Sequence, residues 1–144
     1  MVINRDRYLS QLISGKGNGL IKIITGIRRC GKSFLLNNLF YKHLIENNIL
    51  DNHIVRIAFD AWEMRELCDP ARFMEYLQSR ITDDERYYIL LDEVQLLNDF
   101  VPVLNGLLRR DNLDIYVTGS NSRFLSSDVV TEFRGRGDQI HVYP

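Results

Sequence analysis

Short apolar runs alternate along this chain with segments in which apolar residues recur every three or four positions. The runs are rich in β-branched and aromatic residues, have the length of β-strands, and lie at positions 20–25, 53–59, 87–91, 113–119 and 139–143. The periodic segments predict helices at positions 5–13, 33–48, 70–81 and 100–110. Strands that alternate with helices predict an α/β fold, in which helices flank a parallel five-stranded sheet.

Two of these elements carry additional signals. Asp69 followed by Pro70 is typical of a helix N-cap with proline in the first helical position. The run at 87–91 contains only tyrosine, isoleucine and leucine, which predicts a strand buried on both faces. In a parallel sheet, ligands bind beyond the carboxyl ends of the strands. We therefore expect the chemistry of this chain in the loops that follow the strands at 20–25, 87–91 and 113–119.

The first of these loops, "TGIRRCGKS", concentrates positive charge in a chain whose formal net charge is only −1. It matches the pattern G-x-x-x-x-G-K-[ST] through Gly26, Gly31, Lys32 and Ser33, between a predicted strand and a predicted helix. In such a loop, the glycines let successive backbone N–H groups face a phosphate, and the helix dipole adds to the attraction. Lys32 would reach the β- and γ-phosphates of ATP, and the Ser33 hydroxyl would bind Mg²⁺. A basic surface turn is the alternative, but the flanking strand and helix favour phosphate binding.

The other residues of this loop each leave two interpretations open. Arg28 and Arg29 are not required by the pattern, and they either contact phosphate or a neighbouring subunit or remain solvated. Cys30 is either a reactive thiol at a helix N-terminus or a small residue that fits the loop. We expect the nucleotide to contact the whole segment, namely Gly26, Ile27, Arg28, Arg29, Cys30, Gly31, Lys32, Ser33 and Phe34.

The second loop begins with Asp92 and Glu93, directly after the apolar run at 87–91. A phosphate-loop ATPase carries at this place an acid that holds Mg²⁺, and a catalytic glutamate beside it would polarise the attacking water. The pair alone would equally suit a polar strand end, but it follows the phosphate loop with a strand and a helix between them, which favours catalysis. No N-K-x-D pattern for guanine is present, so we expect ATP rather than GTP.

The third loop, "TGSNSR", and a later arginine pair give less specific signals. Asn121, or failing that Ser120 or Thr118, would orient water or touch the γ-phosphate, although these residue types also form ordinary turns. Arg134 and Arg136 offer a candidate arginine finger for the nucleotide of a neighbouring subunit in a homo-oligomer. A solvated basic loop is the alternative for both arginines.

Composition limits the class of protein without naming its partner. The chain has 144 residues, which is typical of one domain, and its near-neutral charge gives no argument for nucleic acid or an anionic membrane. Its two cysteines, Cys30 and Cys68, are too few for a disulfide framework. Its apolar runs are only strand-sized, so we expect no membrane span and a cytoplasmic location.

Four segments together resemble a known family: "ITGIRRCGKSFLL", "YYILLDEVQLLNDF", "IYVTGSNSRFLS" and "FRGRGDQIHVYP". They are similar to the bacterial and archaeal AAA-type ATPases in which an AAA domain is joined to a C-terminal domain of unknown function. The resemblance implies an AAA+-like sheet with strand order 5-1-4-3-2, in which the strand before Asn121 lies between the strands that carry the two nucleotide motifs. It also implies that Asn121 matches the residue called sensor 1. Arg136, with Arg134 beside it, matches the finger arginines, although the spacing between the two is shorter than in the best-known AAA motors.

Members of that family continue past the fifth strand into a lid and another domain, whereas this chain ends at Pro144. We therefore expect residues 1–144 to form either the N-terminal ATPase core of a longer protein or a truncated copy, with weak nucleotide affinity and weak turnover on its own. Two other functions stay open: a nucleotide-gated binding module with little turnover, and a small phosphotransferase. The phosphotransferase is disfavoured because Asp92 and Glu93 suit water activation and no acceptor-binding motif is visible.

Overall fold

The computed structural model describes residues 5–25, 31–120 and 137–141. Their helices are α1 (Arg5–Ser14), α2 (Lys32–Phe34), α3 (Tyr41–Glu46), α4 (Pro70–Arg80) and α5 (Phe100–Leu107). Their strands are β1 (Ile21–Thr25), β2 (Ile54–Ala58), β3 (Tyr87–Asp92), β4 (Leu113–Gly119) and β5 (Gly137–His141). Strands and helices alternate along the chain, as the hydrophobic pattern predicts.

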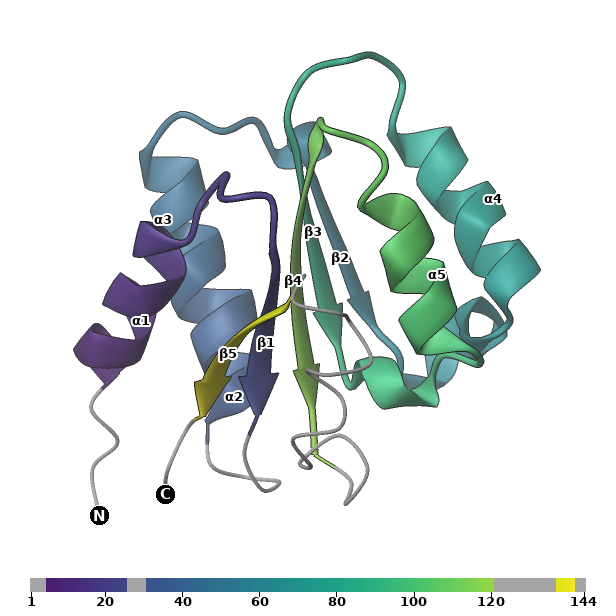
Figure 1. Cartoon of the computed structure of the whole chain (residues 1–144), viewed down its shortest axis with the longest axis horizontal. Helices are drawn as coiled ribbons and strands as arrows, with labels where there is room; N and C mark the ends of the chain where they lie inside the picture. The colour runs from purple at the N-terminus through teal and green to yellow at the C-terminus, as the bar shows by residue number, and fades with distance from the viewer. Residues whose placement is uncertain (1–4, 26–30, 121–136, 142–144) are drawn as a thin grey trace.

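The strands form one sheet in the order β2-β3-β4-β1-β5, and every neighbouring pair is parallel (Figure 1). The prediction of a parallel α/β sheet is confirmed, and β4 lies between β1 and β3 as the family resemblance implies. β5 begins two residues before the predicted run, because its pairing with β1 already starts where Ile21 lies opposite Gly137. All carboxyl ends of the strands therefore meet at one edge of the sheet.

Helices cover both faces of this sheet (Figure 1). On one face, α4 and α5 pack against the sheet through a cluster that includes Phe73, Leu104 and Ile89. On the other face, α1 and the helical stretch from α2 to α3 form a second cluster, which includes Phe40 and Leu90. Neighbouring residues of β3 thus enter opposite clusters, which explains why this strand reads as an uninterrupted apolar run.

A buried ion pair joins β1 to β4 near their amino ends, away from the edge where the strands end. The Lys22 ammonium lies 2.6 Å from Asp114 Oδ1, and the two side chains are 0% and 2% exposed. Asp114 Oδ2 also accepts hydrogen bonds from the Tyr116 hydroxyl (2.7 Å) and from the backbone N–H of Gly17 (3.0 Å). Lys22 also donates to Asn18 Oδ1, so the loop before β1 is fixed to the sheet by this network.

Several helix boundaries differ from the predicted ones. The helix expected at 33–48 contains a π-helical segment, Leu35–Phe40, between α2 and α3, and α5 ends at Leu107 rather than 110. An unpredicted 3₁₀ segment, Trp62–Cys68, precedes α4. The predicted cap of α4 is confirmed, since the Asp69 carboxylate accepts a hydrogen bond from the backbone N–H of Arg72 at 3.1 Å. Within the described part of the chain, no helix combines the length and apolar character that crossing a membrane requires.

Candidate functional site

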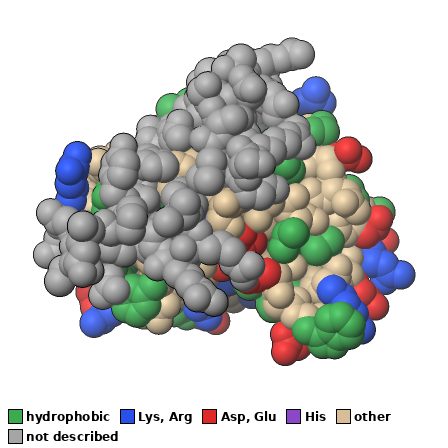
Figure 2. Space-filling model, turned by 90° about the horizontal axis from the view of Figure 1, so that it is seen from below, with side chains coloured by type: hydrophobic (Ala, Val, Ile, Leu, Met, Phe, Trp, Pro, Cys, Tyr) green, Lys and Arg blue, Asp and Glu red, His purple; other side chains and the backbone are tan. Residues whose placement is uncertain are grey.

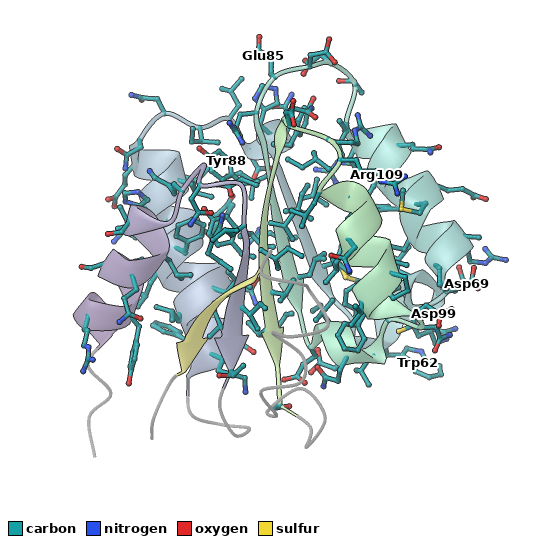
Figure 3. The ribbon with its side chains drawn as sticks, in the orientation of Figure 1. Trp62, Asp69, Glu85, Tyr88, Asp99 and Arg109 are labelled. Atoms are coloured by element: carbon teal, nitrogen blue, oxygen red, sulfur yellow. The ribbon has the colours of Figure 1, made fainter. Side chains whose placement is uncertain are left out.

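Among the described residues, the carboxyl ends of β3 and β4 and the start of α2 bring Ser33, Asp92 and Glu93 to the same edge of the sheet. Figure 3 shows this edge at the bottom, the side on which Asp69 and Asp99 lie, whereas Glu85 and Tyr88 lie toward the opposite edge. Figure 2 looks onto the edge from below, and acidic side chains are visible near the centre of that face. The fold therefore places Ser33, at the described end of the first loop, beside Asp92 of the second, although the two are far apart in the sequence.

The first loop leads directly into α2. Gly31 has φ 96°, a left-handed conformation that glycine adopts readily and that strains residues with a side chain. The helical hydrogen bonds begin at this residue, since the backbone N–H of Leu35 donates to its carbonyl at 2.9 Å. Lys32 follows and is only 3% exposed. The conformation of Gly31 thus ends the loop and orients the start of the helix.

The remaining loop residues that we expect to contact the nucleotide, Gly26, Ile27, Arg28, Arg29 and Cys30, lie outside the described residues. Asn121, Arg134 and Arg136 do so as well. Their predicted roles stay predictions.

Asp92 receives hydrogen bonds from two hydroxyl groups on different elements. The Ser33 hydroxyl lies 2.9 Å from each of its carboxylate oxygens, and the Thr118 hydroxyl donates to Oδ1. Ser33 and Asp92 are separated by 59 positions in the chain, so this contact brings the two predicted nucleotide motifs together. Oxygen atoms of a serine and an aspartate are ligands that Mg²⁺ accepts in proteins.

The environment of Asp92 opposes its negative charge. Burial raises the pKa of the Asp92 carboxyl most strongly, while the hydrogen bonds from Thr118 and Ser33 lower it. The nearby carboxylates of Asp60 and Glu93 raise this pKa further, by smaller amounts. A buried carboxylate with acidic neighbours favours a bound cation, because the cation would stabilise the ionised form.

Glu93 is held at three points immediately after β3. Its backbone has φ 55°, which is uncommon for a residue with a side chain, and its N–H donates to the Thr118 hydroxyl at 2.9 Å. The Ser120 hydroxyl lies 3.0 Å from Oε1 and 2.8 Å from Oε2 of the carboxylate. Gln95 Nε2 donates to Oε2 as well. Glu93 is 8% exposed, so these contacts fix a largely buried carboxylate.

The hydroxyls of Thr118 and Ser120 contact the two acids. The sequence offers Thr118 and Ser120 only as alternatives to Asn121 for contact with water or the γ-phosphate. The sequence carries one signal for the arrangement: Thr118 and Ser120 stand at the carboxyl end of the predicted strand at 113–119, which is the edge where Asp92 and Glu93 are also expected. Nothing in the sequence marks Gln95, whose contact with Glu93 depends on the turn after β3.

Comparison with protein families identifies one family for this chain. The AAA domain family matches residues 18–144 of this chain. An uncharacterized protein of Haemophilus influenzae is 35% identical over 144 residues, which cover 99% of this chain and 36% of that protein. An uncharacterized protein of Methanocaldococcus jannaschii is 31% identical over 150 residues, which cover 99% of this chain and 30% of that protein. The chain thus spans about a third of the length of these curated relatives.

Solved structures agree with the fold. The structure of PCH-2 from C. elegans superposes with a TM-score of 0.64 at 18% sequence identity, covering 96% of this chain and 42% of that one. At this level of identity the likeness concerns the fold alone.

Proposed function

Because this chain belongs to the AAA domain family, we propose that it binds ATP with Mg²⁺ at the carboxyl edge of its sheet and hydrolyses the γ-phosphate bond. The contact between the Ser33 hydroxyl and the Asp92 carboxylate, 2.9 Å to each oxygen, carries this proposal. Ser33 belongs to a motif that favours phosphate binding, Asp92 belongs to an acidic pair that follows this motif in the chain, and the two meet where parallel sheets bind ligands.

The phosphates of ATP would lie at the start of α2. The left-handed conformation of Gly31 and the following helix support this placement, because the N-terminus of a helix offers backbone N–H groups to an anion. Lys32 would donate to the β- and γ-phosphates, and its position in the first turn of the helix fits that role. The preceding residues, Gly26 to Cys30, would complete the loop around the phosphates.

Ser33 and Asp92 would hold the Mg²⁺ ion. Mg²⁺ keeps several water ligands and needs only one or two protein oxygens beside those of the phosphates, which fits a hydroxyl and a carboxylate that already face each other. The bound ion would neutralise charge that develops on the phosphoryl oxygens during transfer. The burial that raises the pKa of Asp92 also makes a cation favourable at this position.

Glu93 would accept the proton of the attacking water. It directly follows the metal-binding acid, and its carboxylate is oriented by Ser120 and Gln95. A positioned general base typically contributes about 10²–10⁴-fold to the rate. Asn121 would orient the same water, and Arg136 would reach the γ-phosphate of a neighbouring subunit in a homo-oligomer.

A calorimetric titration of Mg-ATP into the Lys32→Ala variant tests nucleotide binding. Loss of a charge-assisted contact to phosphate should weaken affinity by about 10-fold to 100-fold. Lys42→Ala is the matched control, because this lysine is 74% exposed and pairs with Glu46 at a distance of 3.8 Å. Equal affinity of the Lys32→Ala variant and the parent, with both shown to be folded, would reject the proposed site.

A further inference from the structure

Two hydroxyl groups at the end of β4 contact the two acids that follow one another at the end of β3. We propose that Thr118 and Ser120 are positioning residues, which hold Asp92 for metal binding and Glu93 for water activation. This inference rests on the proposed function, and it assigns to the strand before Asn121 a task that is separate from any contact with the nucleotide. The two residues act on different atoms, so their loss should have different consequences.

Thr118 connects the two acids through a single hydroxyl group. It donates its hydrogen to Asp92 Oδ1 and accepts the backbone N–H of Glu93 at 2.9 Å. The residue is fully buried, at 0% exposure, so water does not replace either bond. Glu93 has the left-handed backbone conformation, which is unfavourable for a residue with a Cβ atom and persists when surrounding contacts hold it. Thr118 supplies such a contact, and it therefore fixes both the orientation of the Asp92 carboxylate and the backbone conformation of Glu93 after β3.

Ser120 acts on the Glu93 carboxylate itself. Its hydroxyl lies 3.0 Å from Oε1 and 2.8 Å from Oε2 of Glu93. Gln95, which follows β3, donates from its Nε2 to Oε2. An ionised carboxylate has about four acceptor sites, and these two donors leave acceptor capacity for a water molecule. The contacts thus restrict the orientation of the base without occupying it fully. Fixed orientation of a catalytic group is a large part of what an enzyme contributes to rate.

Steady-state hydrolysis by the full-length protein separates the two tasks. Ser120→Ala should lower kcat by about 10-fold to 100-fold while ATP affinity and the Mg²⁺ concentration for half-maximal rate stay at the parent values. Thr118→Val removes the hydroxyl at nearly constant shape, and it should lower kcat and also raise the required Mg²⁺ concentration. Thr118→Ser restores the hydroxyl and should return both quantities to within about threefold of the parent.

Two hydroxyl residues away from this edge provide matched controls. Ser79→Ala removes a hydroxyl that donates to the carbonyl of Tyr76 on α4, and Thr82→Val removes one that contacts the Tyr87 hydroxyl. Both variants should keep the parent kcat. If Thr118→Val does not fold, Thr118→Ser and Ser120→Ala still test the proposal.

The double variant Ser120→Ala, Glu93→Gln tests whether Ser120 acts on the rate through Glu93 or by another route. In single-turnover measurements, Ser120→Ala should add nothing to the loss already caused by Glu93→Gln, because residues that act as a unit are non-additive. An additive loss, an unchanged kcat in Ser120→Ala, or an increased kcat would each overturn the inference. These outcomes differ from failure of the proposed function, in which Glu93→Gln itself would hydrolyse ATP at the parent rate.

Discussion

Replacing Asp114 by asparagine should strongly destabilise the domain without altering the nucleotide edge. Asparagine keeps the shape of the side chain and can still accept hydrogen bonds from the Tyr116 hydroxyl and from the backbone N–H of Gly17. It removes the negative charge 2.6 Å from the Lys22 ammonium, which is fully buried. Removing one partner of a buried ion pair costs about 3–5 kcal/mol, because the other charge remains buried without compensation.

The lower end of this range is expected here, about 3 kcal/mol, because Lys22 keeps its bond to Asn18 and its position over the Tyr116 ring. That is a large fraction of the roughly 5–15 kcal/mol that separates folded from unfolded domains. For a domain of this size, it corresponds to a decrease in Tm of about 6–12 °C.

Urea unfolding followed by circular dichroism measures this free energy directly. Asp111→Asn is the control, because Asp111 is an exposed aspartate just before β4, and it should change stability by less than about 0.5 kcal/mol. Adding Lys22→Met to Asp114→Asn should recover much of the loss, since the uncompensated charge is then gone. A loss below about 1 kcal/mol in Asp114→Asn, or a double variant in which the two losses add, would refute this account of the ion pair.

Two further predictions concern the nucleotide edge. Between about pH 4 and its raised pKa, the folded protein keeps a proton on Asp92 that the unfolded chain releases, so ionisation of Asp92 lowers stability as pH rises through this window. Asp92→Asn should therefore raise the free energy of unfolding of the ligand-free protein above that of the parent, and this gain, measured in urea, should be larger at pH 8 than at pH 5. Stabilisation by Mg-ATP should be lost in the same variant. An equal gain at both pH values would contradict the role of burial. Mixing Arg136→Ala subunits with Lys32→Ala subunits of the full-length protein should recover part of the ATPase activity that each variant lacks alone. In a mixed pair, the intact nucleotide site of one subunit faces the intact arginine of the other. Lack of recovery in subunits shown to associate would remove Arg136 from the mechanism.

The sequence predicted those features that depend on local patterns. The apolar run at 87–91 predicts a strand buried on both faces, and Asp69 with Pro70 predicts the cap of α4, because each depends on adjacent residues and their periodicity. The motif around Lys32 follows one predicted strand, and Asp92 follows another. Because the carboxyl ends of parallel strands meet at one edge of the sheet, the sequence predicts that both residues lie near that edge.

Features that depend on tertiary contacts were not predictable in this way. Lys22 reads as an interruption of an apolar strand, because its partner Asp114 lies 92 positions away in the chain. The left-handed conformation of Glu93 accompanies a hydrogen bond from its N–H to the Thr118 hydroxyl on β4, 25 positions away in the chain, which no local pattern encodes. The π-helical segment Leu35–Phe40 likewise interrupts a helix whose hydrophobic spacing is regular.

The most direct test of the proposed ATPase is to measure binding and turnover together in the Glu93→Gln variant of the full-length protein. Glutamine keeps the size of the side chain but cannot act as a general base, so phosphate release should fall by about 10²–10⁴-fold while the affinity for Mg-ATP stays within about threefold of the parent. Glu75→Gln, at an exposed position of α4, should retain the parent rate. Phosphate release at the parent rate by Glu93→Gln would contradict the central claim, because the carboxylate held by Ser120 would then have no part in hydrolysis.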